Sequence, residues 1–447
     1  MQGERRQVRF LLAMAGLGGL LYGVDFGVIA AAEPYLKAMG VYSDSQISHV
    51  VGAVLLGGLV SSITAGWLCD FFGRRRMIVA SSAMFLAAIP VVSLSLDSFP
   101  LLFAGRVLQG MSAGYMAVAM PMYLTETLPA DIRGRGTGVF QFCLGLGLVV
   151  AAGAGCLVAT WYGASDQADA AGMNAAWSAN FWWTMVPVAV LFIGSLRLKE
   201  SPVWKTRHSH TPPLTHSPTR PLNHSTLLQR RYVVPFLLAV LVLTFNKTTG
   251  MSSFTSYLVT ILHSAGFDGI FANWGQLAVK LTNMLVTIAA AVLVDRKGRT
   301  WLLKVGVGGM TLGLAAIGGV FLAIERFGVE ASNATGLATL AAFFFMQAFY
   351  ALGPGICVWL VLSELMPVRI RANGMAIALF MNQLVAWGLA SWFRPWVAAW
   401  GWSSMYFFFA ANGVLYFITV CFIPETKGKS LDELEHLFEK SVTQRHG

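Results

Sequence analysis

The stretch from residue 232 to residue 263 constrains the fold of this chain more than any other. It is apolar at first, turns polar in its middle at Asn246, Lys247 and Ser252, and is then apolar again. Its length matches the hydrocarbon core of a bilayer, which is about 30 Å thick. A lysine and an asparagine at the centre of a lipid-facing helix are costly. We therefore predict a membrane-spanning segment that opens near Gly250 and faces a water-filled site.

The composition also indicates an integral membrane protein. Of the 447 residues, 56% are hydrophobic and only 12% are charged, whereas about a quarter of a soluble domain is charged. The net charge of +10 is typical of membrane proteins with Lys- and Arg-rich cytoplasmic loops, so we expect no nucleic-acid partner. The five cysteines form no CxxC pair, and we expect no cofactor and no metal site.

Twelve apolar windows are long enough to cross a membrane, and we predict an all-α protein with twelve transmembrane helices. The first window is interpreted as a span rather than a cleaved signal peptide, because it is too long and contains Asp25. Placing both termini in the cytoplasm puts most Lys and Arg residues in cytoplasmic segments, as the positive-inside rule requires. The windows are residues 10–32, 47–69, 77–96, 100–125, 137–161, 178–196, 232–263, 272–294, 301–323, 335–363, 374–398 and 401–423.

A polar segment divides the windows into two sets of six. We predict an N-terminal bundle over residues 1–196, a cytoplasmic linker over 197–231, a C-terminal bundle over 232–423 and a cytoplasmic tail over 424–447, part of which forms a short amphipathic helix. The linker is basic and rich in Pro and His. The spacing of its histidines is irregular, so we interpret it as a solvated connection and not as a metal site.

The two halves carry the same charged motifs at the cytoplasmic ends of corresponding spans. One motif is an aspartate followed by Gly and Arg, and the other is a glutamate and an arginine seven residues apart with a proline between them. This repetition indicates duplication of a six-helix unit. The arginines alone could serve to set topology, but the recurring acids favour a gate that pairs across the halves when the inner side is closed. The gate residues are Asp70, Arg74, Glu126, Arg133, Asp295, Arg299, Glu364 and Arg371.

These motifs resemble those of the major facilitator superfamily and, within it, the sugar porter family. The resemblance extends over all twelve windows and implies two pseudo-symmetric six-helix bundles that surround a central sugar site. The residues that carry it are Gly105-Arg106, Pro121 to Glu126 with Arg133-Gly134, Glu200-Ser201-Pro202, Asp295 to Arg299, Gly353 to Trp359 with Glu364, and Pro424 to Gly428.

The resemblance also implies which residues contact the sugar. Gln141, Asn283, Trp359 and Asn382 match polar or aromatic contacts of the family. Amides both donate and accept hydrogen bonds, and an indole offers an apolar face with one N–H donor, so these side chains suit a polyhydroxylated ligand.

Several positions depart from the family pattern. Where the family usually has two glutamines and an asparagine in the seventh span, this chain has Asn246, Lys247 and Ser252, and Gln383 replaces a tryptophan in the eleventh. Two interpretations of Lys247 stay open: the substrate carries a carboxylate, or the site holds an acid partner. Two also stay open for Lys280: it lines the cavity, or its side chain extends to the outer surface.

An acid and a base in the first half form a candidate coupling pair. Asp25 and Arg106 lie at similar depths below the outer edge of their spans, and an unpaired charge there is costly, so we expect them to meet. We interpret the pair as the proton-coupling site, with a purely structural ion pair as the alternative. Tyr22, one turn before Asp25, is expected to line the same cavity or to pack, whereas Glu33 is expected at the membrane interface.

We therefore expect a secondary transporter that imports a sugar or polyol with a proton by alternating access. One alternative keeps the fold and carries a sugar acid, because of Lys247 and Lys280. Another is a sensor that binds sugar without transporting it. No phosphate-binding loop, HExxH or GxSxG motif occurs, so we expect no enzyme. We expect a monomer in the bacterial inner membrane, whose partners are the sugar, the proton and the lipid bilayer.

Overall fold

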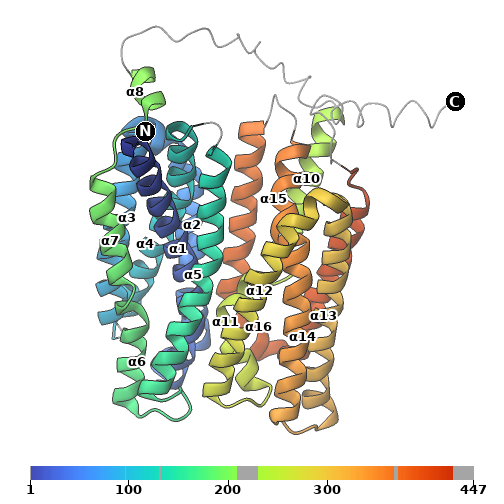
Figure 1. Cartoon of the computed structure of the whole chain (residues 1–447). Helices are drawn as coiled ribbons and strands as arrows, with labels where there is room; N and C mark the ends of the chain where they lie inside the picture. Colours follow the sequence, from blue (N-terminus) through green and yellow to red (C-terminus); the bar gives the residue numbers. More distant parts are fainter. Residues whose placement is uncertain (1, 96, 130–131, 209–229, 367–370, 426–447) are drawn as a thin grey trace, which may run out of the picture.

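The computed structural model describes residues 2–95, 97–129, 132–208, 230–366 and 371–425. Within these ranges the regular structure is helical throughout. Most of the chain forms two bundles that stand side by side (Figure 1). The short helix α8 (Pro202–His208) follows the first bundle, and the rest of the linker (209–229) and the predicted tail helix lie outside the described residues.

Each bundle is built from long helices. The first contains α1 (Gln2–Ala38), α2 (Asp44–Phe72), α3 (Arg74–Leu94), α4 (Phe99–Thr127), α5 (Arg133–Tyr162), α6 (Ala170–Trp182) and α7 (Met185–Leu196). The second contains α10 (Arg230–Thr248), α11 (Met251–Ser264), α12 (Gly269–Lys297), α13 (Arg299–Phe327), α14 (Asn333–Leu352), α15 (Pro354–Leu365) and α16 (Arg371–Cys421).

Every predicted window falls on helical structure, which confirms the all-α membrane fold. Among the described residues, ten helical segments are long and apolar enough to cross a membrane. One of them is interrupted by Gly401 (φ 80°, ψ 165°) and so supplies two windows. Helix α4 is of similar length but is not among the ten. It carries the polar residues Arg106, Gln109 and Ser112, all of them buried inside the protein.

Two spans of the second bundle are broken near their middle. Between α10 and α11 the chain passes through Gly250, whose φ of 80° lies in the left-handed region that favours glycine. Between α14 and α15 the break is at Gly353, which is followed by Pro354. The predicted opening near Gly250 is confirmed, and it leaves backbone and polar side chains facing inward at mid-span.

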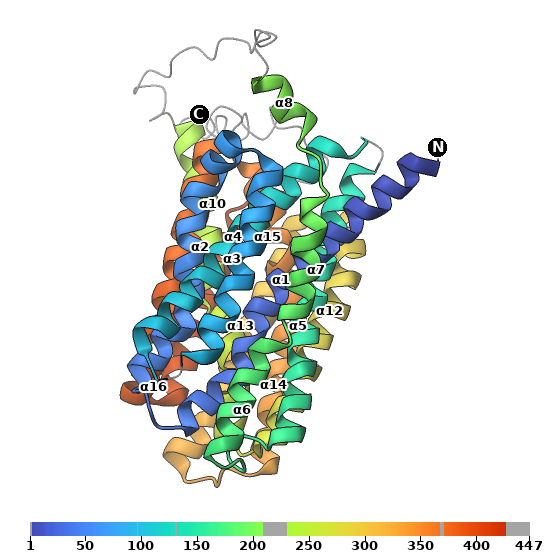
Figure 2. The same cartoon turned by 90° about the vertical axis from the view of Figure 1, so that its left-hand side faces the viewer.

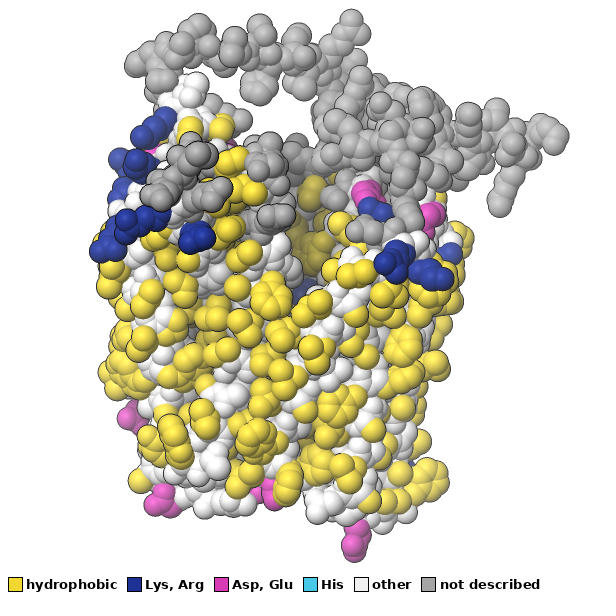
Figure 3. Space-filling view, viewed as in Figure 1, with side chains coloured by type: hydrophobic (Ala, Val, Ile, Leu, Met, Phe, Trp, Pro, Cys, Tyr) yellow, Lys and Arg dark blue, Asp and Glu magenta, His cyan; other side chains and the backbone are white. Residues whose placement is uncertain are grey.

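The two ends of the molecule differ in charge. We call the end where α1 begins and where α8 lies the linker end, and the opposite end the distal end (Figure 1). Lys and Arg side chains gather at the linker end, and acidic side chains are seen at the distal end (Figure 3). The sheath between them is mostly hydrophobic, as expected for a surface that faces lipid.

The two bundles meet along pairs of long helices. Helix α16 packs on α2 and helix α12 packs on α5, at opposite edges of the interface (Figure 2). Small residues permit this close approach: a Cβ placed on Gly52 of α2 would lie 2.2 Å from the Ser391 hydroxyl of α16. Close packing through small residues is typical of helices that associate within a membrane.

Candidate functional site

Asp25 of α1 and Arg106 of α4 lie next to each other in the middle of the first bundle. The Asp25 Oδ1 is 3.7 Å from the Arg106 Nη1, and both residues are 1% exposed. The predicted meeting of the two charges is therefore present in the structure. Neither carboxylate oxygen of Asp25 accepts a hydrogen bond from the residues that the structure describes. A carboxylate held by charge alone can take up a proton without breaking a hydrogen bond.

Arg106 is held in place by its other neighbours. Its Nη1 donates to the Oε1 of Gln109 at 2.8 Å, and its guanidinium lies 5.6 Å from the centre of the Phe181 ring. Gln109 was not identified from the sequence, although its spacing of three residues from Arg106 places it on the same helix face. Tyr22 packs its ring on Phe26 with centroids 5.1 Å apart, one turn from Asp25.

The break between α10 and α11 holds three of the predicted site residues. The Nζ of Lys247 donates to the hydroxyl of Ser252 at 3.4 Å across the break. Asn246 is 3% exposed, and its Oδ1 has no hydrogen-bond partner among the described residues. The break therefore places a cation, an amide and a hydroxyl together at mid-span.

Helix α12 presents a polar stripe to the interior. The Oδ1 of Asn283 accepts a hydrogen bond from Gln347 of α14 at 2.8 Å. One turn away, Lys280 is only 3% exposed, so the interpretation that its side chain extends to the outer surface is wrong. A further turn away, Gln276 is fully buried, and neither atom of its amide has a partner among the described residues. Gln276 and Gln347 were missed, although both are amides within apolar spans.

The remaining predicted contacts come from three other helices. Gln141 is exposed on α5, and Trp359 is 44% exposed on α15. Asn382 of α16 is 2% exposed, with its Oδ1 unpartnered among the described residues. Its neighbour Gln383 reaches the other bundle, since its Nε2 lies 2.7 Å from where a Cβ on Gly58 of α2 would be. Gln383 thus lies at the interface between the halves.

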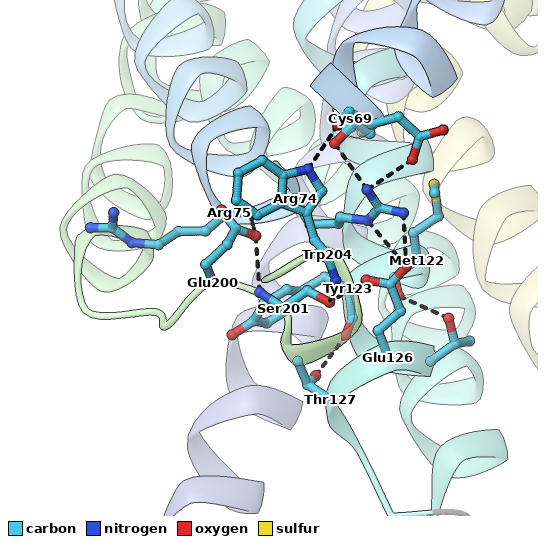
Figure 4. A network of polar contacts seen from close by, with 12 residues as sticks. Cys69, Arg74, Arg75, Met122, Tyr123, Glu126, Thr127, Glu200, Ser201 and Trp204 are labelled. Carbon is cyan, nitrogen blue, oxygen red and sulfur yellow. Dashed lines mark hydrogen bonds and ion pairs between the residues drawn. The ribbon is translucent and has the colours of Figure 1, made fainter. Parts of the chain in front are cut away.

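A network around Arg74 organises the linker end of the first bundle (Figure 4). The Arg74 guanidinium is 2.8 Å from Asp70 and 2.9 Å from Glu126, and it also donates to the carbonyl of Cys69. Glu200, in the segment after α7, accepts a hydrogen bond of 3.0 Å from the backbone N–H of Arg75. The network ties the ends of α2 and α4 and the start of α3 together.

The second bundle repeats this arrangement. The Nε of Arg299 is 3.4 Å from Glu364, and Glu425 accepts a 3.0 Å hydrogen bond from the backbone N–H of Arg299. The side chains of Arg133, Asp295 and Arg371 lie outside the described part. Each ion pair between described residues at this end lies within one half. Pairing across the halves, which we expect when the inner side is closed, therefore stays a prediction.

At the distal end, by contrast, charged contacts cross between the halves. The Nη1 of Arg394 on α16 is 2.6 Å from the Oε1 of Glu33 on α1, and its Nε is 3.0 Å from Asp44 at the start of α2. Thr260 of α11 also donates to Glu33. Glu33 lies near the outer end of its span, but its side chain is fully buried in contacts between the halves. We call Glu33, Asp44 and Arg394 the distal clasp.

Further contacts support the closed distal end. Ser48 of α2 accepts from the Tyr257 hydroxyl of α11 at 3.4 Å and from the backbone N–H of Arg394 at 3.2 Å. A cavity of about 150 Å³ beside the clasp is lined in part by Lys37, Tyr257 and Trp402. Pockets that enclose small organic ligands measure about 300–1,000 Å³, so this one is too small for a sugar.

The molecule is therefore closed at the distal end and open at the linker end. A space-filling view shows it hollowed between the halves at the linker end (Figure 3). Between the residues that the structure describes, ion pairs cross the halves at the distal end and not at the linker end, which is the asymmetry of one state of a two-sided carrier.

Comparison with known proteins identifies similar chains over nearly the full length. A family model described as "Sugar (and other) transporter" matches residues 11–212 and 215–438. The arabinose-proton symporter of Bacillus subtilis is 27% identical over 459 residues, which cover 95% of this chain and 94% of that protein. The galactose-proton symporter of Escherichia coli is 26% identical over 451 residues, which cover 95% and 93%.

Solved structures share the fold. The inward open conformation of the xylose transporter XylE from Escherichia coli matches with a TM-score of 0.78 at 24% sequence identity, and the match covers 95% of this chain and 98% of that one. At this identity the likeness bears on the fold alone.

Proposed function

We propose a function for this chain from one premise, which is that it belongs to the sugar transporter family. The chain is a secondary active transporter that imports a sugar or polyol together with a proton, and it is not an enzyme. Similar proteins are named as proton symporters for arabinose and galactose, and their likeness covers 95% of this chain. Net transport, rather than sensing without transport, is favoured because the described helices form a two-sided carrier with one side closed.

The observation that carries the proposal is the buried contact between Asp25 and Arg106. A neutral sugar needs no charged pair in the first bundle, whereas a proton symporter needs a group that changes charge during the cycle. Asp25 is that group, because its carboxylate has a cation at 3.7 Å and accepts no hydrogen bond from described residues. Arg106 stays anchored on Gln109, and so does not follow the carboxylate when it becomes neutral.

In the transport cycle, the two ends of the molecule open in turn. With the distal end open, Asp25 takes a proton from outside and the sugar binds between the halves. The distal clasp then forms, the linker end opens, and sugar and proton leave to the cytoplasm. The linker end faces the cytoplasm because Lys and Arg gather there. Both termini are cytoplasmic, and the protein acts as a monomer in the bacterial inner membrane.

The available driving force is sufficient for uphill import. One charge that moves through about 100 mV supplies about 2.3 kcal/mol. One unit of pH difference adds about 1.4 kcal/mol. Together these terms support accumulation of a neutral sugar by a few hundredfold.

The test measures uptake of labelled arabinose, galactose and xylose into proteoliposomes with an imposed pH gradient. Accumulation above the outside concentration is expected, and collapse of the gradient should abolish it. Asp25→Asn should lose accumulation and keep exchange of sugar for sugar, whereas the exposed Asp97→Asn should behave as the unmodified protein. If Asp25→Asn accumulates sugar normally, the coupling role is wrong. Binding without any flux would favour the sensor.

A further inference from the structure

Two lysines in the second bundle have no acidic partner among the residues that the structure describes. Lys280 is 3% exposed on α12, and Lys247 lies at the end of α10. No ion pair within 4.0 Å involves either lysine among the residues that the structure describes, and the one polar contact described for Lys247 is the hydroxyl of Ser252. The first bundle differs here, because the cation within its spans, Arg106, has Asp25 beside it.

The second bundle contains no acid that could neutralise them at mid-span. Each of its acids lies at or beyond a helix end. Asp268 caps the start of α12 and Asp295 is in its last turn. Glu325 is near the end of α13, Glu330 follows α13, and Glu364 is near the end of α15. A cation buried in a membrane protein without a protein partner marks a place where an anion binds.

Lys280 faces the space between the two halves. On α12, Leu277 and Met284 lie against Gly153 and Gly145 of α5 in the other bundle. Lys280 is three residues from one and four from the other, so it shares the helix face that is turned toward the first bundle. Gln276 and Asn283 flank Lys280 one turn away on each side. The Lys280 side chain is only 3% exposed, so it is enclosed by protein and not by lipid.

Resting on the proposed function, we propose that the cargo is a sugar acid: a monosaccharide or polyol that carries one carboxylate. Lys280 binds the carboxylate, and Lys247, at the broken span, is the second cationic contact. The amides of Gln276, Asn283 and Asn382 receive hydroxyl groups. Two of these three amides have oxygens without partners in the described part of the chain, which leaves acceptors available for sugar hydroxyls.

This assignment changes the charge that crosses the membrane. A sugar acid is ionised at neutral pH. Entry of one carboxylate with one proton moves no net charge, whereas entry of a neutral sugar with one proton moves one positive charge. Uptake of the sugar acid therefore depends on the pH gradient and not on the membrane potential.

The first experiment compares matched ligands on the purified full-length protein. Glucuronate is compared with glucose, and galacturonate with galactose, by ligand-induced thermal stabilisation and by titration. The acid of a pair should bind roughly tenfold to hundredfold more tightly, as expected for a hydrogen bond to a charged group. Lys280→Gln should remove most of that preference and Lys247→Gln part of it, because the acid loses more affinity than the neutral sugar. Lys297→Gln, an exposed residue at the end of α12, is the matched control.

The second experiment measures uptake of the same ligands in proteoliposomes, with the potential set by potassium and valinomycin. Glucuronate or galacturonate uptake should follow the pH gradient and be unchanged by the potential. Tighter binding of the neutral sugar, or equal losses for both ligands in the lysine variants, overturns the sugar-acid assignment. Proton-driven uptake of neutral sugar alone would keep the proposed function and overturn this one. Binding of the acid that depends on Lys280, with no flux, would uphold the subsite and overturn the proposed transport.

Discussion

Glu33 of α1 and Arg394 of α16 form a buried ion pair that joins the two halves at the distal end. Their Oε1 and Nη1 atoms are 2.6 Å apart, and the side chains are 0% and 7% exposed. The two residues are 361 positions apart in the chain, so the contact exists only when the halves close on this side. The pair therefore stabilises the state that is open at the linker end relative to the state that is open at the distal end.

Breaking the clasp should shift the protein toward the distal-open state. In Arg394→Gln, Glu33 is left buried without its cation, a loss that costs about 3–5 kcal/mol in buried pairs. The loss destabilises only the state in which the distal end is closed. A cysteine at Ser48, which is fully buried beside the clasp, should react with a membrane-impermeant maleimide added from outside in the variant and be protected otherwise. The five native cysteines are replaced beforehand.

The double variant Glu33→Gln with Arg394→Gln serves as the internal check, because it removes both charges and should regain part of the protection. Arg326→Gln changes an exposed arginine at the end of α13 and should leave the labelling rate as it was. If Arg394→Gln is labelled no faster than the unmodified protein, the clasp does not hold the distal end closed.

Most of the fold could be predicted from the sequence because each span is encoded locally. A window of apolar residues long enough for the bilayer needs no information from elsewhere in the chain. The break at Gly250 was also predictable, since a polar run in mid-span is unstable unless the helix opens toward water or protein. The contact of Asp25 with Arg106 was expected from equal depth and from the cost of an unpaired charge.

The distal clasp was missed although the same argument applies to it. Glu33 and Arg394 each lie near the outer end of a span, where a charge can reach water at little cost, so depth alone did not require a partner. Whether such a charge has a partner depends on which helices meet across the halves. That is a property of the tertiary structure, which the sequence pattern does not show. Lys280 was left with two interpretations for the same reason, because a long side chain can extend either way until its neighbours are known.

Gln109 should tune the acidity at which coupling operates. Its Oε1 accepts a 2.8 Å hydrogen bond from the Arg106 Nη1, the same atom that is 3.7 Å from Asp25. In Gln109→Leu the Arg106 Nη1 loses this acceptor and can donate a hydrogen bond to Asp25 directly. That bond favours the ionised carboxylate of Asp25. The pH profile of sugar accumulation in proteoliposomes should therefore move toward lower external pH, while sugar exchange is kept.

Gln167→Leu, at an exposed loop position, is the control for this variant. An unchanged pH profile in Gln109→Leu, with normal expression and exchange, would mean that Gln109 does not restrain Arg106.

Gln347 should act on substrate affinity through Asn283. Its Nε2 donates to the Asn283 Oδ1 at 2.8 Å, which fixes the orientation of that amide on α12. Gln347→Leu leaves the amide free to rotate, and loss of a hydrogen bond of this kind costs about 0.5–1.5 kcal/mol. The KM for uptake should rise about twofold to tenfold, while the ratio of protons to sugar stays the same. A change in that ratio without a change in KM would contradict a positioning role.

Arg74 should be a structural anchor of the linker end rather than a participant in binding. It is 2% exposed and contacts Asp70, Glu126 and the carbonyl of Cys69, so Arg74→Ala leaves Glu126, whose side chain is 14% exposed, without its cation. Removing one partner of a buried pair destabilises by about 3 kcal/mol or more. The melting temperature of the purified variant should fall clearly, whereas Arg76→Ala, at an exposed position on α3, should change it little.

Arg74→Lys should recover only part of the loss, because a single ammonium cannot reproduce the forked contacts of the guanidinium. Ligand affinity per folded molecule should be unchanged in all three variants, and a selective loss of affinity in Arg74→Ala would place this network in the binding site instead.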